Sequence, residues 1–562
     1  MNISKYQFSQ KYHIQIDVRV PMRDGVTLST DVYLPSKEGT FPTMLVRTIY
    51  DNQNKNHMVT TKGFLDEGYA VAMQDCRGRF DSHGEFNPYY QEAEDGYDTQ
   101  EWIGSQSWCD GNIGMFGGSY VGYTQSLTAP LRSKYLKAMV PTVSQQDNFG
   151  HWRVDGPLQL HVAMNFIHMA GRTMQMGPRS LIDSEEFYRR LPLISALDDI
   201  ADVPFYRACV EHNTYDDFWK GYSLRYVYNE IDTPAYIVTG WYDNLVHEGF
   251  KLYRGWSKEA RSKDARQLSK LLVGPWLHGP VGEPAPGPID FGSAAKIDFV
   301  KEQVRWNDRR LKGVDNGIDD EPPVRIFVMG ENVWRSENEW PLARTNYTNY
   351  YLHGQGSANS LLGDGVLNES APGDEPSDSY TYDPDDPVWT LGGQIMAIQE
   401  NITGPQDRRP VERRSDVLVY STSPLESDIE VTGPVSLTIY ASSSATDTDF
   451  TGTLVDVHPD GKAIIITEGL LGVRYRKSIE ETTPITPGKV YELNVDMWET
   501  SNVFKAGHCI RLEISSSNFP RFERNLNTGK HSAFDSDMQL AHQTIFHDSN
   551  GPSHLVLPII PR

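Results

Sequence analysis

A glycine-flanked serine constrains this chain more than any other feature of its sequence. The apolar residues 113–116 lead into Gly117, Gly118 and Ser119, and helix-forming sequence follows over residues 120–129. This order predicts a strand, a sharp turn and a helix that lift the serine hydroxyl out of the backbone, where a histidine can reach it. Val121 stands where the common motif has its second glycine, so the pattern alone leaves a catalytic and a structural serine equally open.

Charge and hydropathy exclude several classes of protein. The chain carries 52 basic and 75 acidic residues, a net charge of −23, which argues against binding to nucleic acids or anionic membranes. No apolar run approaches the roughly 18 residues that span a bilayer, and residues 1–15 lack an apolar signal core, so a cytoplasmic location is the default expectation. The cysteines are spaced too widely for a zinc site or a disulfide framework, and reduced, mostly buried thiols are expected at Cys76, Cys109, Cys209 and Cys509.

The pattern of apolar residues divides the chain into three parts. Strands alternating with helices over residues 1–143 and again over 229–345 predict a discontinuous α/β core with a parallel sheet. The intervening residues 144–228 have helical spacing and few strand-like runs, and we interpret them as a helical cap. Over residues 346–562 apolar and polar residues alternate with period two, which predicts a β-sandwich of the jelly-roll type.

Two later positions supply the partners that a serine nucleophile needs. A serine hydroxyl reacts only when a base takes its proton and an acid orients that base. Asp243 follows the apolar strand at 235–239, and His278 follows the strand at 271–273. Both lie after Ser119 in the order Ser, Asp, His that α/β-hydrolases use. The sequence therefore predicts a triad of Ser119, Asp243 and His278.

Other histidines fit this order less well. His247 lies four residues after Asp243 and is interpreted as a polar surface residue. His83 and His151 precede Asp243 in the chain, and His151 falls within the predicted cap. None of the three replaces His278 as the expected base.

A hydrolase also needs donors for the oxyanion of its tetrahedral intermediate. One donor in this fold is the backbone N–H after the nucleophile, here that of Tyr120. The second must come from the loop after an early strand, where Tyr50 follows residues 41–49. Position alone leaves the Tyr50 hydroxyl either a donor or part of a packing tyrosine.

Longer motifs show a family resemblance over nearly the whole chain, from about residue 18 to 560. They are PMRDGVTLSTDVYLP, VRTIYD, GYAVAMQDCRGRFDSHGEF, WCDGNIGMFGGSYVGYTQ, TGWYDN, VGPWLHG, VRIFVMGENVW, TDTDFTGTLVDVHPDGKA and EGLLGVRYR. On these motifs the chain resembles the CocE/NonD hydrolases. In that family the valine after the serine and tyrosine is the normal form, so Val121 no longer argues against catalysis.

The resemblance implies an α/β-hydrolase core with an inserted helical cap and a C-terminal jelly roll. It also implies Ser119 as nucleophile, Asp243 as acid, His278 as base, and an oxyanion hole formed by the Tyr50 hydroxyl and the Tyr120 N–H. The implied chemistry needs neither a metal nor an organic cofactor. A small-molecule ester or acyl compound is the expected partner, and pairing of jelly-roll edge strands would give a homodimer.

The substrate is less constrained than the chemistry. Trp152 falls near the start of the cap and either lines the acyl pocket or packs in the core. Family members that take aromatic acyl groups tend to carry an aromatic residue just after a GWYDG-type motif. Here that motif reads GWYDN and is followed by Leu245, which argues against an aromatic acyl preference. Family members that grip an α-amino group use clustered carboxylates near the pocket. Asp216 and Asp217 lie in the cap and are interpreted as a solvated face.

These observations favour a serine hydrolase that cleaves a small carboxylic ester through an acyl-enzyme. The same triad serves a Xaa-Pro dipeptidyl-peptidase or an acylase acting on amino-acid esters or β-lactam side chains, and this is the main alternative. A binding protein that retains the fold without catalysis is a remote third possibility.

Overall fold

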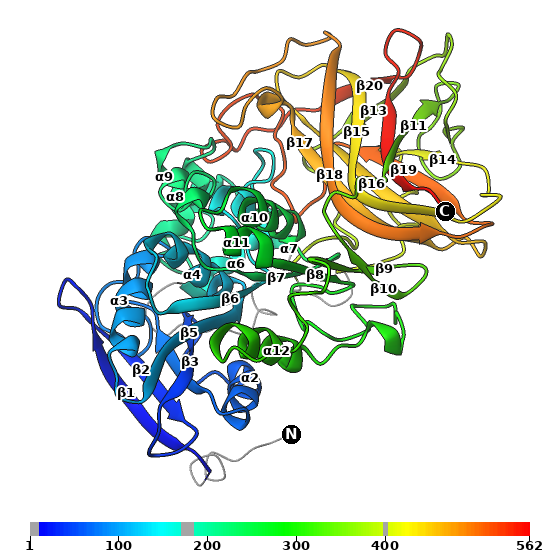
Figure 1. Ribbon diagram of the computed structural model, residues 1–562. Helices are drawn as coiled ribbons and strands as arrows, with labels where there is room; N and C mark the ends of the chain where they lie inside the picture. Colours follow the sequence, from blue (N-terminus) through cyan, green and yellow to red (C-terminus); the bar gives the residue numbers. More distant parts are fainter. Residues whose placement is uncertain (1–10, 170–184, 397–402) are drawn as a thin grey trace.

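A computed structural model describes residues 11–169, 185–396 and 403–562. Figure 1 shows a mixed α/β part that contains the N-terminal half of the chain and a β-rich part formed by the C-terminal residues. The α/β part is built on a ten-stranded sheet in the order β1-β2-β4-β3-β5-β6-β7-β8-β9-β10. Its strands are β1 (His13–Pro21), β2 (Thr27–Leu34), β3 (Phe41–Thr48), β4 (Ala70–Asp75), β5 (Cys109–Gly118), β6 (Leu136–Thr142), β7 (Tyr236–Gly240), β8 (Lys270–Gly274), β9 (Val324–Val328) and β10 (Val333–Glu337).

The seven strands from β4 to β9 in this order run parallel, whereas β1, β2 and β10 pair antiparallel at the two ends. Side chains alternate between two cores: Leu45 of β3 lies in one apolar cluster, and Met44 and Val46 lie in the other. This alternation is the period-two geometry of a strand that is buried on both faces. The carboxyl ends of the parallel strands therefore meet at one edge, where the predicted site residues follow β3, β5, β7 and β8.

Helices cover both faces of this sheet. Phe64 of one helix and Trp306 of another pack on the Met44 face, whereas Ile103 and Leu127 pack on the Leu45 face. The helices of the α/β part are α2 (Lys55–Asp66), α3 (Glu92–Gly104), α4 (Tyr120–Thr128), α10 (Val246–Glu259), α11 (Lys263–Leu268) and α12 (Phe299–Leu311).

Five short α-helices lie between β6 and β7 in the described part of this segment. They are α5 (Asn148–Trp152), α6 (Leu160–Asn165), α7 (Glu185–Tyr188), α8 (Pro204–Glu211) and α9 (Asp217–Lys220). The strands on either side are neighbours in the sheet, because Thr142 pairs with Val238. The chain thus leaves the sheet and returns beside the same strand, while the exact domain boundaries drawn from sequence stay a prediction.

The C-terminal β-domain has its own apolar core. Val435, Leu437 and Ile439 are buried in it, as their alternation with polar residues predicts. Hydrogen bonding joins eleven strands around this core. They are β11 (Asn346–His353), β12 (Val366–Asn368), β13 (Asp378–Tyr382), β14 (Leu418–Ser421), β15 (Ile429–Ser443), β16 (Asp449–Val457), β17 (Ala463–Gly472), β18 (Tyr491–Phe504), β19 (Cys509–Ser515), β20 (Ala541–Phe546) and β21 (His554–Ile560).

The β-domain is joined to the α/β sheet by backbone hydrogen bonds. The Met329 N–H donates to the Ser501 carbonyl at 3.0 Å, and the Val503 N–H donates to the Met329 carbonyl at 2.9 Å. Within the described residues all four cysteines are free thiols, three of them buried, as expected. Among the same residues, no helix combines the length and apolar character needed to cross a membrane.

Candidate active site

The turn that holds Ser119 is a strained strand-to-helix elbow. Ser119 has φ of 60° and ψ of −127° and lies between the end of β5 and the first residue of α4. A positive φ costs free energy for any residue with a Cβ and persists only where surrounding structure enforces it. The Ser119 N–H donates to the Thr142 carbonyl at 2.9 Å, which ties the elbow to the end of β6.

The glycines of the elbow explain its departure from the common motif. A Cβ at Gly117 would lie 2.2 Å from Cγ1 of Val121, so the valine fills the space that this glycine leaves. A Cβ at Gly122 would lie 2.8 Å from Cβ of Ser144, at the start of the segment that follows β6. Both contacts are too close for a side chain, and so the second glycine is needed one residue later than usual.

The structure brings Asp243 and His278 together. Asp243 is fully buried on the loop after β7, and its Oδ1 accepts a hydrogen bond from Nδ1 of His278 at 2.8 Å. The Leu245 N–H donates to the same oxygen at 3.0 Å. A carboxylate at Nδ1 favours the tautomer that carries its proton there, which leaves the lone pair of Nε2 available as a base. His278 remains partly accessible, with 16% of its side chain exposed.

The β-domain supports the loop that carries Asp243. The Tyr242 hydroxyl donates to the carbonyl of Ile465 in β17 at 3.1 Å. The Gln394 side-chain amide donates to the Trp241 carbonyl, also at 3.1 Å. Both contacts cross from the C-terminal part of the chain to the two residues before the acid, so the acid loop is held from outside the α/β part.

Tyr50 lies on the loop after β3, whose neighbour in the sheet is β5. It is half-buried, and its N–H donates to Oγ1 of Thr48 at 2.9 Å. The next turn is held by Asp75, whose Oδ1 accepts the Asn52 N–H at 2.8 Å. Burial raises the pKa of Asp75 to about 8. The loop that carries the second predicted oxyanion donor is therefore fixed by buried polar contacts.

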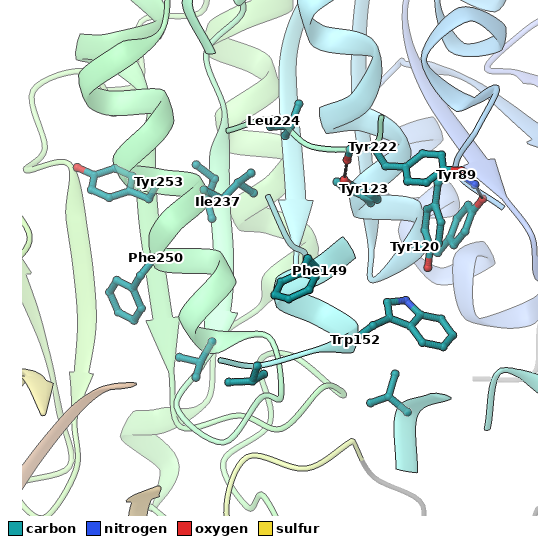
Figure 2. Packing of buried hydrophobic residues seen from close by; sticks show 14 of the residues in the cluster. Tyr89, Tyr120, Tyr123, Phe149, Trp152, Tyr222, Leu224, Ile237, Phe250 and Tyr253 are labelled. Carbon is teal, nitrogen blue, oxygen red and sulfur yellow. Dashed lines mark hydrogen bonds between the residues drawn. The ribbon is translucent and has the colours of Figure 1, made fainter. Parts of the chain in front are cut away.

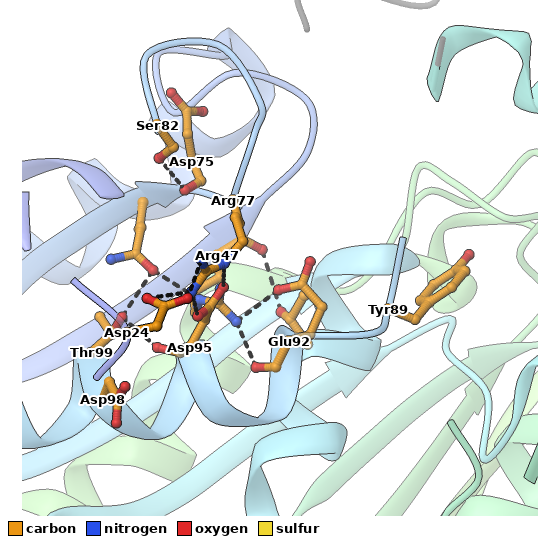
Figure 3. A network of polar contacts seen from close by, with 12 residues as sticks. Asp24, Arg47, Asp75, Arg77, Ser82, Tyr89, Glu92, Asp95, Asp98 and Thr99 are labelled. Atoms are coloured by element: carbon orange, nitrogen blue, oxygen red, sulfur yellow. Dashed lines mark hydrogen bonds and ion pairs between the residues drawn. The ribbon is translucent and has the colours of Figure 1, made fainter. Parts of the chain in front are cut away.

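A buried ion pair holds the first residue of α4. The Tyr120 hydroxyl donates to Oε1 of Glu92 at 2.8 Å and accepts the Tyr89 N–H at 2.9 Å. Glu92 in turn pairs with the fully buried Arg47 at 2.8 Å, within the polar network that Figure 3 shows. Sequence reasoning missed Arg47 and Glu92, because the two are 45 positions apart and no local pattern marks their contact.

Aromatic rings connect the cap to this elbow. Trp152 of α5 is fully buried, with ring centroids 4.4 Å from Phe166 and 5.3 Å from Phe205. Phe205 also lies 5.3 Å from Tyr89, which stacks on Tyr120 at 4.6 Å. Figure 2 shows Trp152 on the same side of this cluster as Tyr89 and Tyr120. A continuous buried cluster of aromatic rings thus joins the cap to the elbow.

Comparison with known proteins identifies the family. A family model described as X-Pro dipeptidyl-peptidase (S15 family) matches residues 24–280, and the C-terminal non-catalytic domain of the X-Pro dipeptidyl-peptidases matches residues 316–556. Cocaine esterase of Rhodococcus sp. (strain MB1 Bresler) is 40% identical over 580 residues, covering 98% of this chain and 99% of the esterase. The chain belongs to the S15 family. It is a serine hydrolase, and the resemblance drawn from its motifs is confirmed.

Solved structures of similar proteins share the S15 fold. An α-amino acid ester hydrolase superposes with a TM-score of 0.83 at 25% identity, covering 98% of this chain and 97% of the other. An aminopeptidase from the marine sediment archaeon Thaumarchaeota archaeon gives 0.87 at 24% identity, with the same coverage. These likenesses confirm the predicted fold class, an α/β-hydrolase core followed by a β-rich domain.

The remaining histidines of this S15 member lie in different surroundings. The surface interpretation of His247 was wrong: only 11% of its side chain is exposed, its ring stacks on Trp498, and its Nδ1 lies 3.2 Å from Oε2 of Glu499. This burial depends on residues about 250 positions away, which sequence spacing does not reveal. His83 is exposed and pairs with Thr27 at 2.9 Å.

His151 is buried in the cap, in the electrostatic field of His278. Burial first, and then the neighbouring His278, lower the pKa of His151 to about 3. His151 is therefore neutral at physiological pH and adds no positive charge beside the predicted base.

The other predicted pocket residue and the cap carboxylates are also in defined places. Leu245 is fully buried directly before α10, two residues after the acid. Asp216 caps α9 by accepting the Phe218 N–H at 3.1 Å and lies 2.6 Å from Nδ1 of His212, whereas Asp217 is exposed.

Proposed function

We propose that the chain hydrolyses small carboxylic esters through an acyl-enzyme on Ser119. The observation that carries this proposal is the hydrogen-bonded Asp243–His278 pair on the loops after β7 and β8, at the same sheet edge as the strained elbow of Ser119. The 40% identity to a cocaine esterase over the whole chain supports ester chemistry.

The proposed reaction uses three side chains of the triad, two oxyanion donors and a water molecule. Nε2 of His278 takes the Ser119 proton as Oγ attacks the ester carbonyl, and the buried Asp243 carboxylate stabilises the imidazolium that forms. The Tyr120 N–H and the Tyr50 hydroxyl donate to the oxyanion. The alcohol leaves with the proton from His278, and a water activated by the same histidine then releases the acid and restores Ser119.

One observation favours an ester over a dipeptide, and a second bears on the acyl group. A site for a substrate amine needs a carboxylate with no cation already bound to it. Among the described residues, two buried carboxylates between cap and core already have a cation: Asp147 pairs with Arg225, and Glu248 pairs with Nζ of Lys251 at 3.0 Å. Leu245 further replaces the aromatic residue expected for aromatic acyl groups, which favours a small aliphatic acyl group.

The proposal is tested by Ser119→Ala and by labelling with a fluorophosphonate. We expect the intact chain to gain one phosphonate on Ser119, and the alanine variant to gain none and to lose roughly 10⁴-fold or more in kcat on a small activated ester. An unchanged thermal unfolding curve shows that the variant is folded. A variant that keeps a tenth of the activity would contradict the assignment of Ser119.

The alternative peptidase function is tested on the same protein. A proline-linked chromogenic dipeptide is compared with an ester of the same chromogenic leaving group. We expect a larger kcat/KM for the ester, and a faster reaction with the dipeptide would instead assign the chain to the peptidases of its family.

A further inference from the structure

Three potential metal ligands meet at one end of the β-domain, in a region that the proposed reaction does not use. Asp456 lies near the end of β16, His458 begins the turn into β17, and His508 directly precedes β19. One ligand atom from each side chain lies within 4.8 Å of the others. Within the described residues, no other group of three acidic, histidine or cysteine side chains meets this criterion.

The backbone holds these three positions firmly. β16 and β19 are antiparallel neighbours, with Asp456 opposite Ile510 and Val457 opposite Cys509. The turn at His458 is closed by its own backbone, because its N–H donates to the Lys462 carbonyl at 2.8 Å. The ligand atoms are therefore carried by paired strands and a tight turn, which limits how far they can separate.

The hydrogen bonds within the cluster leave ring nitrogens of His458 available to coordinate a metal ion. Nδ1 of His508 donates to Oδ1 of Asp456 at 2.8 Å, while Nε2 of His458 lies 3.9 Å from Oδ2 of the same carboxylate. Among the described residues, the His458 ring makes no hydrogen bond. His353 of the same domain is a contrast, since Glu375 and the Ser370 carbonyl occupy both of its ring nitrogens, at 2.7 and 3.0 Å.

Exposure gives the cluster an entry path. The side chains of Asp456 and His508 are 8% and 14% exposed, whereas that of His458 is 38% exposed. The two imidazole rings lie 4.5 Å apart between centroids with an interplanar angle of 35°. Solvent thus reaches the cluster past His458.

We propose that Asp456, His458 and His508 bind a divalent transition-metal ion such as Zn²⁺. Two imidazoles and one carboxylate form a donor set that suits zinc and its neighbours, whereas Ca²⁺ and Mg²⁺ require mostly oxygen ligands. Ligands of tetrahedral zinc lie about 2.0–2.2 Å from the metal, so binding would draw the partly exposed His458 ring toward Asp456 and His508.

Binding requires a tautomer change at His508. In the metal-free arrangement its Nδ1 carries the proton donated to Asp456. When the metal binds, that proton moves to Nε2 through solvent, and the Nδ1 lone pair and the Asp456 carboxylate become ligands. The ion then ties the turn after β16 to the start of β19, as a structural clip rather than as part of the reaction.

The test is calorimetric titration of Zn²⁺ into the full-length chain after removal of metals with EDTA. We expect one saturable site per chain, and His458→Ala to weaken binding by at least about tenfold, since even changes behind a ligand cost that much. Because His458 is partly exposed, the variant should unfold at the same temperature as the parent chain without metal. Zn²⁺ should raise that temperature only in the parent, because it binds the folded state.

Two control variants make the outcome decisive. His353→Ala removes a histidine–carboxylate contact of the same domain outside the cluster, and Cys509→Ser removes the nearest thiol on β19; both should retain full affinity for Zn²⁺. Absence of a saturable site in the parent chain would overturn the proposal. Equal affinity in His458→Ala, or loss of the site in Cys509→Ser, would overturn it as well, because the metal would then bind elsewhere.

Discussion

The core wall and the cap wall of the candidate site are built from different interactions. The core wall comprises the loops and elbow that carry Ser119, Asp243, His278 and Tyr50, and directional hydrogen bonds hold it. The cap wall comprises α5 to α9, where rings such as that of Trp152 pack on other rings. Hydrogen bonds are directional and fix the orientation of the groups that they join, whereas apolar packing tolerates changes in side-chain shape at a modest cost in stability. We therefore propose that the core wall determines the reaction and that the cap wall determines which acyl group is accepted.

The largest effect that separates the two walls is expected from Tyr50→Phe. This change removes the hydroxyl proposed as an oxyanion donor and keeps the ring, and loss of one such donor costs roughly 3–4 kcal/mol of transition-state stabilisation, or 10²–10³ in kcat. Because the oxyanion forms with every ester, the loss should be the same for acetate, butyrate and benzoate esters. Steady-state kinetics on the three esters would measure it, and a loss confined to one acyl group would place Tyr50 in the acyl pocket instead.

A smaller effect is expected from Tyr120→Phe, which removes the contact to Glu92 but keeps the ring. The Tyr120 N–H would then be aimed less precisely, and we expect kcat to fall roughly tenfold with KM unchanged. Glu92→Gln keeps an acceptor for the phenol and should retain more activity than Glu92→Leu. Asp98→Asn, in an exposed ion pair with Arg23, serves as the control. Equal activity of the glutamine and leucine variants would refute this role of Glu92.

The cap wall is tested by Trp152→Phe, which opens space in the aromatic cluster. We expect the ratio of kcat/KM for a bulky acyl ester to that for an acetate ester to rise by roughly five- to tenfold, the size of effect that pocket volume usually has. The rate of phosphonate labelling of Ser119 should change little. An equal fall for every ester would show that Trp152 supports the core wall rather than selecting substrates.

The smallest effects concern the stability of the fold. The contributions of one buried group in each wall are expected to depend on pH in opposite directions. The pKa of Asp75 is raised to about 8, so its contribution to folding is present below its ordinary pKa near 4 and is lost as the pH rises through 8. The pKa of His151 is lowered to about 3, so its contribution is present above pH ~6.5 and is lost as the pH falls toward 3.

The contributions of Asp75 and His151 to stability are measured by thermal unfolding at pH 5, 7 and 9. The variants Asp75→Asn and His151→Asn are each compared with the parent chain. The difference in unfolding temperature between the parent chain and Asp75→Asn should shrink toward pH 9. The difference between the parent chain and His151→Asn should shrink toward pH 5. If the unfolding temperatures of both variants follow that of the parent chain in parallel across this pH range, then neither group titrates as its burial implies.

The sequence predicted the strands and turns that are encoded by local patterns. It did not predict burial that depends on contacts between residues far apart in the chain. The elbow at Ser119, the strands before Asp243 and His278, and the alternation at Val435 are local signals, and the structure has each in the expected element. The burial of His247 against Trp498 depends on a contact across some 250 residues. No periodicity reports on such pairs, because each partner is ordinary within its own segment.

The hydrogen bonds from Ile465 and Gln394 to the acid loop bear on how this enzyme can be shortened. The C-terminal region carries a family description as non-catalytic, and indeed none of the proposed reacting groups comes from it. Removing it would nevertheless leave the Tyr242 hydroxyl and the Trp241 carbonyl without their acceptor and donor, next to the acid. A truncated chain would therefore lose two contacts that hold the loop of Asp243, the proposed catalytic acid. Equivalent contacts would have to be designed before the truncated chain could be expected to hydrolyse a substrate.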